Sequence, residues 1–106
     1  MPRLVPLPGS DWTDTETGQI ERLRELCRST PNWELDSGRA DEGSPWCAIY
    51  DGDDVVLHIA RIDRSYVLAT ETEIMCQSRT IEHAVDRALS ELTTMLRKVR
   101  SPVESE

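Results

Sequence analysis

The chain has 106 residues, which is enough for one domain, and its 20 acidic and 12 basic residues give a formal net charge of −8. This balance argues against binding to nucleic-acid phosphates, which lysine and arginine neutralise. No apolar run approaches the ~20 residues of a membrane-spanning helix, and prolines near the N-terminus interrupt any signal-peptide core. Three widely spaced cysteines make a poor disulfide framework, so we expect a cytoplasmic protein with free thiols.

The chain begins with an irregular arm, predicted over residues 1–12, and a helix follows it. Three prolines in the arm each remove a backbone donor and fix φ, which opposes regular pairing. Thr13 followed three residues later by Glu16 has the form of a capping box, which marks a helix start. The helix is expected to run from about residue 14 to residue 29, because Pro31 opposes its continuation.

Three or four antiparallel strands are expected after this helix. The first is a short strand at about residues 32–36, and denser strands follow near residues 45–50, 54–62 and 65–70. Asp51-Gly-Asp-Asp is a strong hairpin signal, since glycine adopts a positive φ at low cost. Asp63-Arg64 marks a second tight turn.

The last helix is the clearest element of the sequence. Apolar residues recur at i, i+3, i+4 and i+7 from Ile81 to Val99, and Ser78 or Thr80 can cap the first turn. Residues 101–106 are expected to form a frayed tail. The sequence therefore predicts one α+β domain over residues 13–100, with an antiparallel three- to four-stranded sheet, an N-terminal helix and a long C-terminal helix in the order α-β-β-β-β-α.

The turn signals also predict how the strands pair. With Gly52 and Asp53 as a two-residue loop, Tyr50 lies opposite Val55 and Cys47 lies opposite His58. The second turn places Arg61 opposite Tyr66 by the same count. Because side chains alternate along a strand, one face is then expected to carry the aromatic residues and the arginine: Trp46, Tyr50, Arg61 and Tyr66.

Both predicted faces of the sheet are largely apolar, so each needs a cover. The long C-terminal helix is expected on the face of small side chains, and the first helix and the arm are expected on the aromatic face. That second cover is thin for such large side chains. A partner or a second copy of the chain can complete it.

A protein-interaction or regulatory module is therefore the first functional expectation. The partner, or a second copy, is expected to bind through the aromatic face or an exposed sheet edge. Tryptophan, tyrosine and arginine dominate interface energies, so the expected partner-binding residues are Trp46, Tyr50, Arg61 and Tyr66. An arginine on this face indicates that the face opens to solvent at one end, so Arg61→Ala is expected to cost little stability.

An alternative function is that of a small acidic inhibitor which occupies a basic, nucleic-acid-binding groove of a partner protein. Seven acidic residues and a single arginine lie between residues 34 and 54. Such a field attracts a basic partner. The competing interpretation is that these acids only solubilise the surface loops.

A second alternative is a minor thiol-dependent enzyme, in which His58 activates Cys47. No other catalytic motif is present, and the cysteines and histidines lack the short spacing of a zinc site. The carboxylates at residues 51–54 are expected to form a solvated turn, because the turn is shorter than a calcium-binding EF-hand loop. The sequence thus offers no metal, cofactor or small-molecule ligand, and an enzyme is the less favoured class.

The order of the elements resembles that of double-stranded RNA-binding domains. Those domains present a basic cluster at the start of their last helix, which binds phosphates. This chain has Ser78-Arg-Thr-Ile-Glu-His there, so Glu82 counters the only arginine. We therefore expect no direct binding to nucleic acid.

We predict that the purified protein does not bind duplex RNA or DNA at physiological salt, because it lacks the cations that phosphate binding requires. A fluorescence anisotropy titration with labelled duplexes measures this. A micromolar Kd that weakens steeply with added salt would contradict the prediction.

Overall fold

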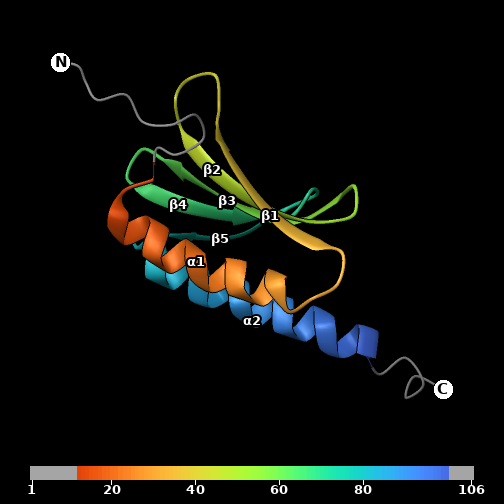
Figure 1. The fold of residues 1–106 in the computed structure, drawn as a ribbon. Helices are drawn as coiled ribbons and strands as arrows, with labels where there is room; N and C mark the ends of the chain where they lie inside the picture. The colour runs from red at the N-terminus through yellow and green to blue at the C-terminus, as the bar shows by residue number, and fades with distance from the viewer. Residues whose placement is uncertain (1–11, 101–106) are drawn as a thin grey trace.

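The computed structural model describes residues 12–100, so most of the predicted arm (residues 1–11) and the predicted tail (residues 101–106) lie outside the described residues. The described residues form one sheet and two helices (Figure 1). The elements follow in the order α1 (Asp14–Arg28), β1 (Trp33–Arg39), β2 (Pro45–Asp51), β3 (Asp54–Ile62), β4 (Ser65–Ala69), β5 (Ile74–Ser78) and α2 (Ile81–Arg100).

The start of α1 is the predicted capping box. The hydroxyl of Thr13 accepts a hydrogen bond from the Glu16 backbone N–H at 3.1 Å, and the Glu16 carboxylate accepts one from the Thr13 N–H at 2.8 Å. These two bonds satisfy donors that a helix start otherwise leaves unpaired. The buried stripe of α1 consists of Ile20, Leu23 and Cys27, which follow helical spacing.

The sheet is an antiparallel meander with the strand order β1-β2-β3-β4-β5. The fold class is therefore the predicted α+β arrangement, but the sheet has five strands where three or four were expected. The additional strand, β5, pairs with β4 over Ile74–Ser78. Its alternation is interrupted, because Leu68 pairs with Cys76 while the next residue, Ala69, pairs with Ile74. Met75 is thus an extra residue, and a short strand with a broken period gives no clear sequence signal.

Both predicted tight turns are confirmed. Asp51 pairs with Asp54 across Gly52, which has φ +66°, and Ile62 pairs with Ser65 across Asp63, which has φ +58°. Glycine and aspartate are among the residues that adopt this left-handed conformation most readily.

A bulge in β3 overturns the predicted pairing of β2 with β3. Tyr50 does lie opposite Val55, as expected, but the next residue back, Ile49, lies opposite Leu57. Val56 is therefore an extra residue, and it packs toward the core. Every pair farther along the hairpin shifts by one residue, so Cys47 lies opposite Ile59 and not opposite His58.

This shift separates the four side chains that were predicted to share a face. Directly paired residues lie on the same side of a sheet. Trp46 pairs with Ala60, while Arg61 pairs with Tyr66 on the other side of β3. The prediction of one aromatic face is therefore wrong: Trp46 and Tyr50 lie on one side of the sheet, and Arg61 and Tyr66 lie on the opposite side.

Both helices lie on a single face of the sheet (Figure 1). α1 packs against α2 and β1, and α2 packs against β4 and β5. One helix was expected on each face of the sheet, so that expectation is wrong. The observed arrangement follows from the bulge, because Cys47, Ile49, Leu57, Ile59 and Leu68 now form one continuous apolar face, which the two helices cover together.

The core lies between this face and the helices. α2 contributes the predicted stripe of small and branched side chains, and the Thr80 hydroxyl caps its first turn by accepting the His83 N–H at 3.1 Å. The buried residues of α2 are Ile81, Ala84, Val85, Ala88 and Leu92. No helix within residues 12–100 has the length and apolar character needed to cross a membrane.

Candidate functional site

The side of the sheet opposite the helices has no helix or strand over it among residues 12–100 (Figure 1). We call it the open face. The strand register arranges its side chains in three cross-strand rows. The rows run Gly38–Trp46–Ala60–Val67–Gln77, then Asp36–Ala48–His58–Ala69–Ile74, then Glu34–Tyr50–Val55, and the Ile62–Ser65 pair ends the face.

Large apolar side chains are exposed on the open face. Ile62 is 46% exposed and Ile74 is 69% exposed, and these are the exposed large hydrophobic residues of the described part of the chain. Both belong to the open face, one near each end of it. Exposed apolar side chains that gather on one side of a protein indicate a binding surface, whereas scattered ones do not.

Trp46 lies across Gly38, its neighbour on β1. A Cβ atom added at Gly38 would come within 2.5 Å of the indole ring. The glycine therefore makes room for the ring, which lies flat along the sheet and covers the β1 backbone. The ring consequently presents its other side outward as a broad, rigid apolar surface, the type of group that dominates binding energy at interfaces.

The floor between the aromatic residues is made of small side chains. Ala48 lies between Trp46 and Tyr50 along β2, and His58 lies between Ala48 and Ala69 across the strands. Both of these alanines are buried, as expected for methyl groups beside larger neighbours. The centre of the open face is therefore shallow and apolar, with one imidazole, and a partner's backbone can approach it closely.

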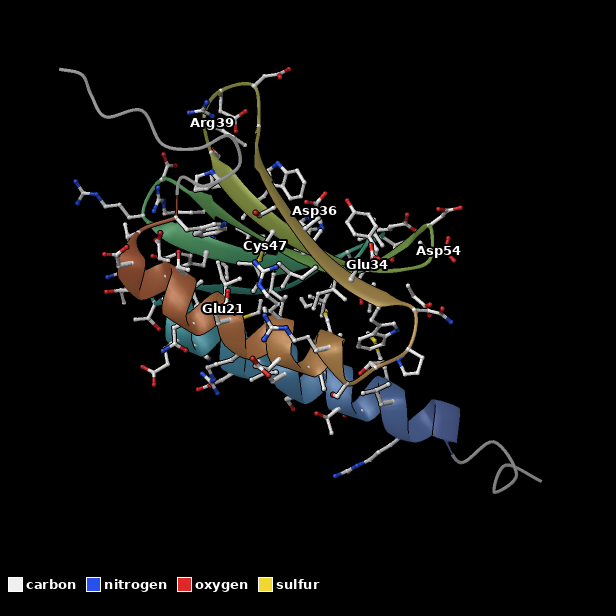
Figure 2. All side chains as sticks on the ribbon, in the orientation of Figure 1. Glu21, Glu34, Asp36, Arg39, Cys47 and Asp54 are labelled. Carbon is white, nitrogen blue, oxygen red and sulfur yellow. The ribbon has the colours of Figure 1, made fainter. Side chains whose placement is uncertain are left out.

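An acidic margin borders the open face along β1, the β1–β2 loop and the β2–β3 turn. Figure 2 shows Asp54, Glu34 and Asp36 following one another along this side of the molecule. All the carboxylates of the margin are exposed, and none forms an ion pair with another described residue. The margin consists of Glu34, Asp36, Asp41, Glu42, Asp51, Asp53 and Asp54.

The backbone of β1 is already partly engaged at its outer edge. The Trp33 N–H donates to the Thr30 carbonyl at 3.2 Å, and the Ser37 N–H donates to the Asp36 carboxylate at 2.9 Å. These donors are therefore occupied, which opposes the addition of a partner strand at this edge. The open face is consequently a better candidate surface than the β1 edge.

Arg61 and Tyr66 have a different role, because both bind a buried carboxylate beneath the helix layer. Glu16 is only 4% exposed. Arg61 Nη1 donates to its two oxygens at 2.6 and 2.7 Å, and the Tyr66 hydroxyl donates to Oε2 at 2.5 Å. The Arg61 guanidinium also stacks on the Trp12 ring, with 5.9 Å from Cζ to the ring centroid.

This cluster keeps Glu16 ionised. Burial alone raises its pKa, but hydrogen bonds from Tyr66, from the Thr13 N–H and from Arg61 outweigh burial, so the pKa of Glu16 falls below 4.5. Burial and the Glu16 carboxylate raise the pKa of Tyr66, so its hydroxyl stays protonated as a donor. Through these hydrogen bonds, the cluster links the start of α1 to the β3–β4 hairpin.

The predicted Cys47–His58 pair is not assembled. Cys47 lies between the sheet and the helices (Figure 2), with 1% of its surface exposed, whereas His58 is on the open face. Burial raises the pKa of the Cys47 thiol to about 12, so it stays protonated and unreactive at neutral pH. Within residues 12–100, no three histidine, cysteine or acidic side chains group together as metal ligands.

Sequence reasoning missed Glu16 as the partner of Arg61, and it missed the separation of the aromatic residues into two sites. The role of Glu16 as the partner of Arg61 was missed because the capping box already explained a glutamate at that position. The only available signal for the separation was Val55-Val56-Leu57, where three successive apolar residues break the alternation of β3.

Comparison with models of protein families finds no match, and neither does comparison with curated proteins or with solved structures.

The Glu16 cluster predicts that Arg61→Ala costs about 2 kcal/mol or more, because it leaves a buried carboxylate without its cation. This replaces the expectation, drawn from the sequence, of a small cost. Urea denaturation at pH 7 measures the change, with Arg64→Ala as the control, since Arg64 is an exposed turn residue without an ion pair among the described residues. Equal stabilities of the two variants would contradict the cluster's role.

The same cluster predicts an acid dependence. A lowered pKa in the folded state means that Glu16 adds stability above about pH 4.5, and that this stability is lost as the pH falls through the lowered pKa. Glu16→Gln removes this contribution, so the stability gap between wild type and variant should narrow toward pH 3. A gap that stays constant with pH would show that ionisation of Glu16 contributes nothing.

Proposed function

We propose that this chain is a protein-binding module whose ligand docks on the open face of the sheet. The observation that carries the proposal is the contrast between the two sides of the sheet. One side is sealed by both helices, while the other exposes Ile62 and Ile74 and also carries Trp46 and Tyr50. A sheet with an apolar second face is ordinarily covered by a further layer, and a partner protein supplies such a layer here.

The binding residues differ in part from those expected from the sequence. Trp46 and Tyr50 remain in the proposed surface, and Ile62 joins them on the same face. Arg61 and Tyr66 are left out of it, because the Glu16 carboxylate engages their polar groups on the helix side. The proposed surface thus combines two aromatic anchors with an aliphatic one, which is the usual composition of an interface centre.

The function of an acidic inhibitor is the second candidate, and the acidic margin supports it. The margin follows β1 and the turns at the two ends of β2, so its exposed carboxylates create a negative field along this border of the sheet that attracts a basic groove. An inhibitor of this kind binds mainly through charge, and its affinity falls steeply with salt. A module that docks through the open face binds mainly through apolar burial, so its affinity changes little with salt.

The test begins with capture of partners from the native host on immobilised wild-type protein, followed by isothermal titration with the purified partner. We predict that Tyr50→Ala and Ile62→Ser each weaken that affinity about tenfold or more, as interface anchors do. Both variants should stay folded, with stability costs within about 1 kcal/mol, because their side chains are partly exposed.

The matched control is Met95→Ala, which removes a comparable apolar side chain from the helix layer. Its affinity for the partner should equal that of wild type. Unchanged affinity in both open-face variants would contradict the open face as the binding surface, whatever the effect of Met95→Ala. If the affinity falls steeply between 50 and 500 mM salt and is unchanged in Tyr50→Ala, the result would favour the function of an acidic inhibitor.

A further inference from the structure

We propose that the element which occupies the open face is a basic amphipathic helix of a partner protein. This inference rests on the proposed function and names the kind of partner that the same surface takes. Three features of the molecule carry it: the state of the sheet edges, the charge around the open face, and the shape of its floor.

The sheet edges disfavour an added strand. On β1, the Trp33 and Ser37 N–H groups, which point away from β2, are already bonded within the chain. On β5, the extra residue Met75 interrupts the regular spacing of the backbone groups. Neither edge offers the continuous row of free donors and acceptors that strand addition uses, so the partner is expected to lie on the face.

The charge around the open face selects a basic partner. Glu34 and Asp36 point to this face, because they pair with Tyr50 and Ala48, and both acids are exposed. Within the described part of the chain, the face itself carries no lysine or arginine, and Arg39 beside it has a bonding partner of its own. Lysines or arginines along one flank of a docked element would satisfy these two carboxylates.

The same charges disfavour a second copy of the chain as the occupant. Each copy carries a net charge of −8, and within residues 12–100 the open face offers no lysine or arginine to pair with the other copy's acidic margin. In a face-to-face dimer, the burial of apolar surface would therefore be opposed by repulsion between the acidic residues of the two copies. A basic element avoids that repulsion and gains attraction.

The shape of the floor fits a helix. β2 has seven residues, so it is ~24 Å long, and an α-helix of about 18 residues is ~27 Å long. Ala60 of β3 and Ala69 of β4 are small, as is Ala48 of β2, so a helix can approach this part of the sheet closely. A helix laid over β3, with the flat Trp46 ring and Tyr50 along the flank that faces β1, directs the basic residues of that flank toward Glu34 and Asp36.

Three labelled peptides of about 18 residues test the inference by fluorescence anisotropy against the full chain. The first has a leucine and alanine stripe flanked by lysine and arginine. The second replaces each base with glutamate, and the third keeps the composition of the first but scrambles the stripe. We expect micromolar binding of the first peptide, and at least tenfold weaker binding of the other two.

Two protein variants with equal charge changes locate the contact. Glu34→Gln combined with Asp36→Asn should weaken the first peptide about tenfold, and the asparagine keeps an oxygen for the Ser37 N–H. The matched control, Asp14→Asn combined with Glu82→Gln, removes two exposed acids from the helix layer and should leave the affinity unchanged. Tyr50→Ala should also weaken binding.

The outcomes separate this inference from the proposed function. If the acidic peptide binds as well as the basic one, or if the first peptide does not bind at 100 µM, the basic-helix inference is overturned. Light scattering that gives twice the 12.0 kDa chain mass for wild type, and the single mass for Tyr50→Ala, identifies a second copy as the occupant and overturns it too. If the first peptide binds tightly and its affinity is the same for wild type and Tyr50→Ala, the open face is not the docking site. That result would also contradict the proposed function.

Discussion

The single extra residue in β3 decides what each face of this protein is made of. Because side chains alternate along a strand, inserting Val56 moves every later β3 residue to the other side relative to β2. The insertion aligns Ile49 with Leu57 and Cys47 with Ile59, and these residues become the floor of the core. It also aligns Trp46 with Ala60 on the other side of the sheet. Both the sealed face and the open face therefore depend on this bulge.

The two faces then take different kinds of polar group. On the sealed face, Arg61 pairs with the carboxylate of Glu16, which belongs to α1. Hydrogen bonds from Arg61 and Tyr66 keep this carboxylate ionised although it is buried. On the open face, Glu34 and Asp36 have no cation within the described residues. An ionic cluster with its charges paired stabilises the fold, whereas carboxylates without a cation, on the same face as exposed apolar residues, can pair with the cations of a partner. This contrast is the physical basis for the proposal that a partner binds the open face.

Much of the architecture is readable in the sequence, and the part that is not has a clear cause. Hydrophobic periodicity predicts both helices, and turn residues predict the β2–β3 and β3–β4 hairpins, because these signals are local. The identity of the two faces depends on a count of residues between strands. The bulge adds one residue to that count, which moves the later β3 side chains to the other face, and the only sign of it in the sequence is that Val55 and Val56 are adjacent apolar residues.

The role of Arg61 could not be predicted either, because its partner Glu16 lies 45 residues earlier in the chain. Trp46 and Tyr50 were correctly placed together, since both belong to one strand and no count across a hairpin is needed.

The register of β2 against β3 is the central claim, and nuclear Overhauser effects between backbone protons measure it directly. In a uniformly labelled sample, the account predicts cross-strand contacts that join Ala48 to His58 and Cys47 to Ile59, and no regular pairing for Val56. Contacts that join Cys47 to His58 and Ile49 to Val56 would mean that the bulge is absent. The aromatic residues of β2 would then lie on the same side as Arg61, and the assignment of the open face would be wrong.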